Sequence, residues 1–311
     1  MDSLPVVIHS PAEDRVLYAF GEEVHLYMNG SETGGRFAQW LVVSQPGGGP
    51  PPHYHTNDDE WFCVLEGQVS FFRDGEWSEP FGPGTRAWCP RHSVHTYKNV
   101  GTTDSRILQM TEPAGFDQFF TRSAAEFARA GAPDMSRVTE IAAEHGIFFV
   151  TPQQIALRAA LPAPKVLIHP PAENRVHRAF GDEVHLYLSG KETGHLFSQA
   201  LVITQPGGGP PPHYHTQEDE WFHVLHGSVS FFYQGNWTEV RAGGRVWCPK
   251  GSVHTFQNTG DNPSQMLVTT SPAGFDRFFA LCAAEFDNPE GPNMPRIMEI
   301  AAEHGIFFVE P

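Results

Sequence analysis

The sequence predicts an all-β protein made of two consecutive β-barrels, each followed by helices. The first observation is an internal repeat. The segment that begins at His9 recurs from His169, at an offset of 160 residues that falls to 159 after a one-residue deletion near Glu79. The letters IAAEHGIFFV end both copies, at 141–150 and 300–309. A repeat of about 150 residues has the size of a whole domain, so the chain of 311 residues is a duplicated domain.

The second observation is the spacing of turn residues. The chain contains 30 Gly and 27 Pro, which separate short segments rich in Val, Phe, Trp and Tyr. Short strands with turn signals every 8–12 residues or so are typical of a β-sandwich or barrel. In 36–43 and 196–203 every second residue belongs to a shared, mainly apolar face, as in a half-buried strand. This face includes a repeated amide, Gln39 and Gln199, which must find a hydrogen-bond partner if it is buried. We expect this amide to hold the structure or to contact a substrate.

The end of each copy changes to a helical period. Phe116, Phe120 and Phe127 follow a spacing near 3.6 residues, and a second helix is expected at 136–145, stopped by Gly146. We therefore predict an N-terminal domain at 1–151, a linker at 152–164 that contains prolines, and a C-terminal domain at 165–311.

Composition narrows the classes of partner. Lys and Arg total 20 against 36 Asp and Glu, which gives 20 − 36 = −16, and no basic cluster offsets this charge. Nucleic acid and anionic membrane surfaces are therefore not expected as partners. The chain has no apolar run of about 18 residues and no signal-peptide pattern at its start. The 4 Cys form no CxxC pair and no disulfide-style framework, so we expect a protein of the reduced cytoplasm. Either a monomer or a homodimer is expected.

Histidines and a glutamate recur at the spacing of a metal site. His53 and His55 alternate along a predicted strand and so share a face, Glu60 opens the next strand, and His95 follows a proline turn. Three imidazoles and one carboxylate suit a divalent transition ion, with Fe, Mn, Ni, Cu and Zn all open. Asp59 remains an alternative to Glu60. The second copy repeats the set as His213, His215, Glu220 and His254.

These residues lie in segments that resemble the two motifs of the cupin superfamily. GGGPPPHYHTNDDEWFCVLEG is similar to the first motif and GPGTRAWCPRHSVHTYKN to the second. The first half departs from the second motif at His92, which replaces its internal glycine, whereas the second half keeps that glycine as Gly251. The resemblance covers both halves and implies two antiparallel jelly-roll barrels with a metal inside each. Among two-domain cupins, the intact ligand set with aromatic neighbours is similar to the quercetin 2,3-dioxygenases.

Strand parity suggests which side chains surround each metal. Phe62 and Val64 share the face of Glu60, and Tyr97 shares the face of His95. If these faces point inward, they form an apolar, aromatic pocket, and the same residues could equally be barrel core. The corresponding residues in the second half are Phe222, Val224 and Phe256.

The leading hypothesis is a metal-dependent dioxygenase that acts on an aromatic, enolic or polyphenolic small molecule with O2. The resemblance implies that Glu60 or Glu220 accepts the proton of a substrate hydroxyl. Two alternatives remain open: a non-redox isomerase, cyclase or hydrolase that uses the metal as a Lewis acid, and a metal-containing protein that only binds a small molecule.

Overall fold

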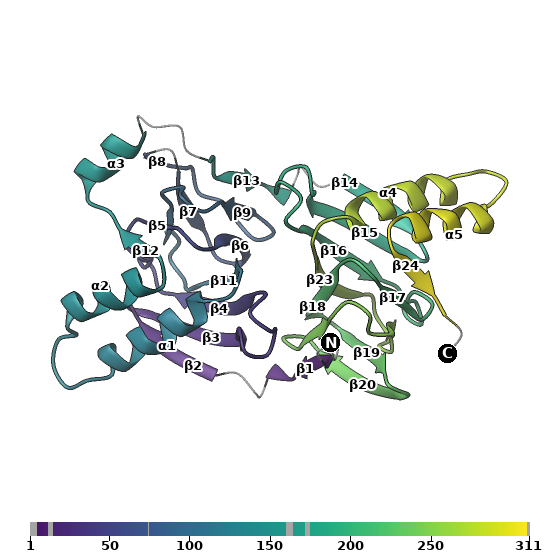
Figure 1. The fold of residues 1–311 in the computed structure, drawn as a ribbon, viewed down its shortest axis with the longest axis horizontal. Helices are drawn as coiled ribbons and strands as arrows, with labels where there is room; N and C mark the ends of the chain where they lie inside the picture. Colours follow the sequence, from purple (N-terminus) through teal and green to yellow (C-terminus); the bar gives the residue numbers. More distant parts are fainter. Residues whose placement is uncertain (1–4, 12–14, 74, 160–163, 172–174, 310–311) are drawn as a thin grey trace. The chain divides into compact units, whose positions relative to one another are not determined.

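The chain folds into two compact units in a computed structural model, which describes residues 5–11, 15–73, 75–159, 164–171 and 175–309 (Figure 1). One unit comprises residues 14–173, and we call it the first barrel. The other comprises residues 1–13 together with 174–311, and we call it the second barrel. Both are built mainly of antiparallel strands, as the sequence predicts.

The first barrel is formed by one seven-stranded sheet together with a three-stranded and a two-stranded sheet. The larger sheet consists of β2 Arg15–Ala19, β3 Glu22–Met28, β4 Ala38–Ser44, β6 Asp59–Glu66, β9 Arg86–Cys89, β11 Ser105–Glu112 and β13 Leu167–His169, in the order β13-β9-β6-β11-β4-β3-β2. The three-stranded sheet consists of β7 Val69–Arg73, β8 Glu76–Trp77 and β10 Thr96–Asn99, in the order β10-β7-β8. The two-stranded sheet pairs β5 His53–His55 with β12 Ile147–Phe149. Alternate residues of the larger sheet, such as Trp40 and Phe62, belong to the core of this barrel.

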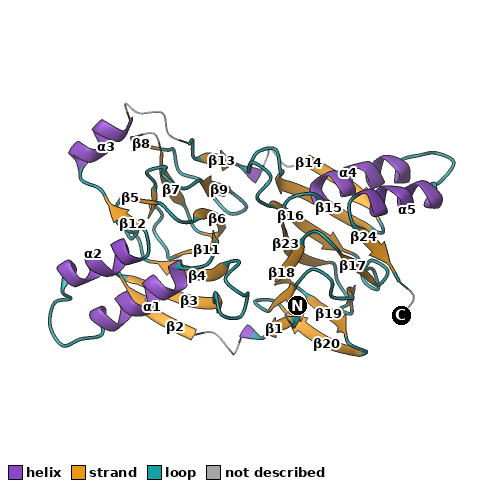
Figure 2. Ribbon diagram, viewed as in Figure 1, coloured by secondary structure: helices purple, strands orange, loops and turns teal. Residues whose placement is uncertain are grey.

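Helices cover one side of the first barrel, as Figure 2 shows. The helix α1 (Phe116–Phe127) buries Phe116, Phe119 and Phe120 in the barrel core. The helix α2 (Met135–Glu144) begins at Asp134, whose side chain accepts hydrogen bonds from the backbone N–H groups of residues 136 and 137. Both helices lie where the period of 3.6 residues predicts them. A third helix, α3 (Pro152–Ala159), occupies most of the predicted linker.

The second barrel repeats this arrangement. Its larger sheet consists of β1 Val7–His9, β14 Arg175–Ala179, β15 Asp182–Leu188, β16 Ser198–Thr204, β18 Asp219–His226, β21 Arg245–Cys248 and β23 Ser264–Ser271, in the order β1-β21-β18-β23-β16-β15-β14. Its smaller sheet consists of β17 His213–His215, β19 Ser228–Tyr233, β20 Asn236–Arg241, β22 His254–Asn258 and β24 Ile306–Phe308, in the order β20-β19-β22-β17-β24. The helices are α4 (Phe275–Phe286) and α5 (Met294–Glu303).

The edge strands β1 and β13 shift the boundaries of the two units away from the predicted division into 1–151, 152–164 and 165–311. The first strand of the chain, β1, pairs with β21 of the second barrel, where Val7 lies opposite Trp247. Its repeat, β13, pairs with β9 of the first barrel, where Leu167 lies opposite Trp88. The two strands read VIH and LIH, so either one offers the same backbone and nearly the same side chains to either edge. The repeat alone therefore cannot assign them.

In the part of the chain that the structure describes, every helix is too short or too polar to cross a lipid bilayer.

Candidate metal centres

Each barrel brings three histidines and one glutamate to a single point between its sheets. In the first barrel, β5 carries His53 and His55, and backbone hydrogen bonds between His53 and His95 hold the third histidine beside that strand. Glu60 reaches the same point from β6 of the facing sheet. The ligand atoms of the four residues all lie within 4.8 Å of one another. The second barrel assembles its own group in the same way, from His213, His215, Glu220 and His254.

The carboxylate lies among the imidazole nitrogens. Glu60 Oε2 is 3.0 Å from His95 Nε2, 3.5 Å from His55 Nε2 and 3.9 Å from His53 Nε2. All four side chains are buried. Glu60 therefore occupies the position that the spacing predicts for the fourth ligand.

The second group has nearly the same dimensions. Glu220 Oε2 is 3.0 Å from His254 Nε2, 3.3 Å from His215 Nε2 and 4.0 Å from His213 Nε2. These four side chains are also buried. Both copies of the predicted ligand set are therefore assembled.

The hydrogen bonds of the Nδ1 atoms, which point away from the centre of the group, show that the first metal-binding group fits a cation. His53 Nδ1 lies 2.9 Å from the Pro51 carbonyl, and His95 Nδ1 lies 3.0 Å from the Ser93 carbonyl. Since a carbonyl only accepts, each Nδ1 carries the hydrogen and each Nε2 presents a lone pair to the centre. His55 Nε2 is buried without an aligned hydrogen bond. Converging lone pairs beside a carboxylate are the donor set of a divalent transition ion.

The same test gives the same result in the second barrel. His213 Nδ1 lies 3.0 Å from the Pro211 carbonyl, and His254 Nδ1 lies 2.9 Å from the Ser252 carbonyl. The buried Nε2 of His215 again lacks an aligned partner. Each barrel thus contains a buried metal-binding group.

The two acidic residues just before Glu60 have different hydrogen-bond partners. Asp58, which is buried, places Oδ2 2.6 Å from His55 Nδ1 and so orients that ring. Asp59 accepts hydrogen bonds from the Arg91 backbone N–H at 2.7 Å and from Arg91 Nη2 at 2.8 Å. The alternative that Asp59 replaces Glu60 as a ligand is therefore wrong, because Asp59 is turned to Arg91.

The protonation states of Glu60, His95 and His213 match the needs of a metal site. Burial raises the pKa of Glu60, but the close approach of His53, His95 and His55 lowers it more, so the net pKa is well below its usual value. Burial lowers the pKa of His95 to about 4 against the opposing effect of Glu60. Burial and the neighbouring histidines lower the pKa of His213 to about 3. At neutral pH Glu60 is a carboxylate and His95 and His213 are neutral imidazoles, the forms that bind a metal. Burial lowers the pKa of His215, but Glu218 and Glu220 raise it more, to about 9, so a metal ion must displace a proton from this ring.

A small aromatic cavity adjoins each metal-binding group. The cavity beside His53 and Glu60 has a volume of about 20 Å³, and its wall includes the predicted Phe62 and Tyr97. The one beside His213 and Glu220 has a volume of about 40 Å³. Phe222 and Phe256, also predicted, belong to its wall. Among the described residues that line the two cavities there is no Lys or Arg.

The other four predicted substrate contacts lie elsewhere. Val64 and Val224 are buried in the barrel cores and do not line the cavities. Gln39 is buried on the face of β4 opposite Trp40, whose ring points to the core. Gln199, which also lies outside the lining of the cavity at His213, donates its Nε2 hydrogen to Thr269 Oγ1 at 3.1 Å.

The cavities also contain residues that sequence reasoning missed. A buried carboxyl lines each one, Glu22 in the first barrel and Asp182 in the second. Rings from the helices, such as Phe116 and Phe275, close the cavities from outside the sheets. The signal for the carboxyls was an acidic residue at the same repeat position among buried strand residues, and the signal for the rings was the repeated Phe pattern of the helices.

Comparisons with known proteins agree with this architecture. The family model described as "Cupin domain" matches residues 40–111 and 200–270. Quercetin 2,3-dioxygenase of Bacillus subtilis (strain 168) is 22% identical over 317 residues, which span 96% of this chain and 91% of that protein.

Solved structures share the fold at low sequence identity. Oxalate decarboxylase of Lactobacillus farciminis, in a formate complex, has a TM-score of 0.63 at 18% identity and covers 86% of each chain. Oxalate decarboxylase from Bacillus subtilis at pH 4.6 has a TM-score of 0.62 at 15% identity, over 97% of this chain and 87% of that one. With a family match in each half and a metal-binding group in each barrel, the chain is a two-domain cupin protein.

Proposed function

We propose that the protein is a metal-dependent dioxygenase that acts on a neutral aromatic or enolic small molecule bearing a hydroxyl group. The observation that carries the proposal is the position of each three-histidine, one-glutamate group at the wall of a cavity built from aromatic rings. The likeness to quercetin 2,3-dioxygenase over 96% of the chain supports it.

The chain's own residues supply binding and proton transfer. His53, His55 and His95 would hold the metal with Glu60 in the first barrel, and the repeated set would hold it in the second. A divalent transition ion supplies sites at which O2 and a substrate oxygen can be brought together. In this proposal Glu60 and Glu220 accept the proton of the substrate hydroxyl, and the rings of Phe62 and Phe222 contact the aromatic part of the substrate.

The charge of the cavities favours a neutral substrate over a small dianion such as oxalate. A dianion removed from water needs a cationic partner such as Arg, which fixes a carboxylate by paired hydrogen bonds. The described lining of both cavities contributes rings and carboxyl groups instead. Under this argument, the shared fold with oxalate decarboxylases does not carry over to their substrate.

The size of the cavities requires movement when the substrate binds. A volume of about 20 Å³ in the first barrel holds about one water molecule. An aromatic substrate must therefore displace the rings that α1 contributes, of which Phe116 stacks on His55 with ring centroids 5.3 Å apart. We expect α1 to shift outward on binding.

An oxygen-consumption assay tests the function. The protein is loaded separately with Fe, Mn, Ni, Cu or Zn and mixed with flavonols, catechols or diketones. We expect O2 uptake equal to substrate loss with at least one metal, and both atoms of ¹⁸O2 in the product. Turnover without O2 uptake would show a non-redox enzyme, and binding without any product would show a binding protein. Either result would overturn the proposal.

A further inference from the structure

The first barrel contains a polar cluster that its metal-binding group does not use. Glu22, at the start of β3, is 3% exposed and accepts a hydrogen bond from the Tyr97 hydroxyl at 2.7 Å through Oε2. Gln109, on β11, accepts a hydrogen bond from Trp40 Nε1 at 2.7 Å through Oε1 and is also 3% exposed. Both Glu22 and Gln109 line the cavity that His53 and Glu60 border.

One hydrogen-bonding atom on each of these two side chains lacks a hydrogen bond of good geometry. Glu22 Oε1 and Gln109 Nε2 are buried without an aligned hydrogen bond, although the Ser44 hydroxyl lies near Glu22 and the Tyr97 hydroxyl lies near Gln109. A buried polar atom left in this state costs about 1–3 kcal/mol, so such atoms in a folded protein call for an explanation. One is an acceptor and the other a donor. A single hydroxyl group could satisfy both, because it can donate to a carboxylate and accept from an amide.

The second barrel has replaced most of this cluster with apolar side chains. Its equivalent carboxyl, Asp182, accepts a hydrogen bond from Thr204 Oγ1 at 2.6 Å. The remaining members are exchanged in the aligned copy, where Trp40, Tyr97 and Gln109 correspond to Ala200, Phe256 and Val268. Phe256 and Val268 line the second cavity. The two cavities therefore differ in chemistry although their metal-binding groups match.

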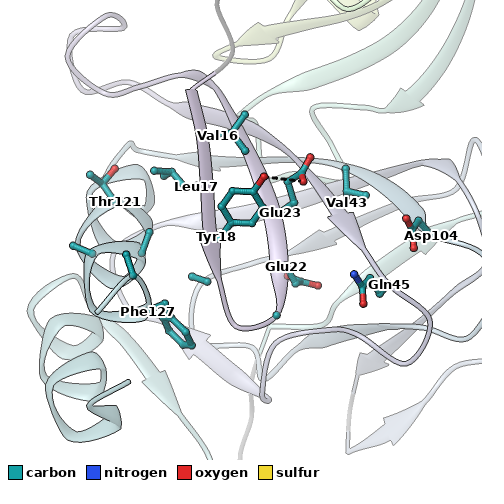
Figure 3. Close-up of a pocket in the computed structure, with 15 residues that line it drawn as sticks. Val16, Leu17, Tyr18, Glu22, Glu23, Val43, Gln45, Asp104, Thr121 and Phe127 are labelled. Atoms are coloured by element: carbon teal, nitrogen blue, oxygen red, sulfur yellow. Dashed lines mark hydrogen bonds between the residues drawn. The ribbon is translucent and has the colours of Figure 1, made fainter. Parts of the chain in front are cut away.

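Glu22 also borders an open groove on the outside of the first barrel. This groove, shown in Figure 3, has a volume of about 820 Å³ and is lined by residues of β2, β3 and α1, with Tyr18 and Phe127 among them. Glu22 is common to the lining of the groove and of the cavity. The groove is also lined by Glu23 and Asp104, which disfavour an anionic ligand.

We propose that Glu22 and Gln109 recognise a phenolic hydroxyl of the substrate in the first barrel, at the end of the molecule away from the metal. The second barrel lacks this recognition and takes the same ring system without preference for that hydroxyl. The inference rests on the proposed function for the identity of the substrate class, and it makes the first barrel the one that distinguishes between hydroxylated substrates.

Binding without O2 tests this inference. Quercetin and 3-hydroxyflavone share the hydroxyl–ketone pair that can reach a metal and differ in their other ring hydroxyls. Both are titrated by calorimetry into the full-length, metal-loaded protein under anaerobic conditions. We expect one class of sites to bind quercetin at least tenfold more tightly than 3-hydroxyflavone. Substitution Gln109→Val, which installs the residue of the second barrel, is expected to reduce that preference to less than threefold.

Two further variants make the result decisive. Glu22→Gln keeps the shape of the side chain, and we expect it to reduce the preference as well, which tests the inference even if Gln109→Val does not fold. Asp182→Asn changes the corresponding carboxyl of the second barrel and is expected to leave the preference intact. A preference that survives in both first-barrel variants, or that disappears in Asp182→Asn, would overturn the inference.

The binding readout separates this inference from the proposed function. If the preference is found but no O2 is consumed with any metal, only the dioxygenase proposal fails. If O2 is consumed but wild-type protein binds the two flavonols equally, only the inference about Glu22 and Gln109 fails.

Discussion

The Oδ2 atom of Asp58 lies 2.6 Å from the Nδ1 atom of His55, and both side chains are buried. This contact fixes the ring of His55 so that its other nitrogen points at Glu60, 3.5 Å away. In the second barrel, Glu218 Oε1 is 3.2 Å from His215 Nδ1 but is not aligned for a hydrogen bond. The longer side chain at position 218 therefore orients its histidine less firmly.

This difference predicts unequal effects of removing the two carboxylates. Asp58→Asn is expected to weaken metal binding in the first barrel by about 10–100-fold, because a ligand histidine loses its charged hydrogen-bond partner. Glu218→Gln is the matched change in the second barrel, and we expect a smaller loss there. Competition with a chromophoric chelator measures both affinities. An effect of Glu218→Gln as large as that of Asp58→Asn would contradict this account.

The turn before the third histidine is strained in one barrel only. His92 has φ = 72°, a left-handed conformation, and the equivalent Gly251 has φ = 84°. A Cβ atom at Gly251 would meet nothing within 4 Å, so a substitution there has a conformational cost only. We expect Gly251→Ala to destabilise the second barrel by about 1 kcal/mol.

The reverse change provides the control for this prediction. His92→Gly relieves the same strain in the first barrel, but a glycine also gains freedom in the unfolded chain. The same entropy contribution offsets part of the strain in Gly251→Ala, so the two shifts are expected to be opposite in sign and similar in size. Thermal unfolding followed by circular dichroism measures both shifts. A Gly251→Ala protein as stable as wild type would show that this backbone conformation carries no cost.

The buried carboxyl of Glu22 predicts a pH dependence of stability. Burial raises the pKa of Glu22 from 4.5 to about 7, against smaller opposing effects of the Tyr97 and Ser44 hydroxyls. Between these two pH values the folded protein keeps a proton that the unfolded chain has released, so this group makes folding less favourable as the pH rises. The difference between these two pKa values corresponds to roughly 3 kcal/mol.

Glu22→Gln removes this titration. Relative to wild type, the variant is expected to gain stability steadily from pH 4.5 to pH 7 and to show no further gain above pH 7. Urea unfolding of both proteins at several pH values measures the difference, in which contributions common to both proteins cancel. A stability difference that does not change over this range would contradict the raised pKa.

The sequence was sufficient for the features that depend on a local pattern. The alternation of His53 and His55 and the helical Phe spacing follow from residues close together in the chain, and the duplication follows from a direct comparison of the two halves. The structure confirms the elements they predict. Four of the eight predicted cavity residues line the cavities for the same reason, since strand parity relates Phe62 to Glu60.

Features that depend on long-range pairing could not be predicted in this way. The exchange of β1 and β13 is invisible because the two strands have nearly the same sequence. Gln39 lies on the face away from the cavity because the register of β4 is set by its partner strands, which place Trp40 opposite Gln109. Glu22 is 38 residues from Glu60 in the chain, and only the closed barrel brings both to one cavity.

The most direct test of the account is the metal content of single-histidine variants. Wild-type protein, reconstituted with a divalent transition metal and freed of excess ion, is measured by elemental analysis. We predict two metal ions per chain for wild type and one for each of His55→Ala and His215→Ala, while His25→Ala, whose histidine contacts Glu23 away from both centres, retains two. Wild-type protein that binds no metal, or a single substitution that empties both barrels, would contradict the claim that each barrel holds its own ion.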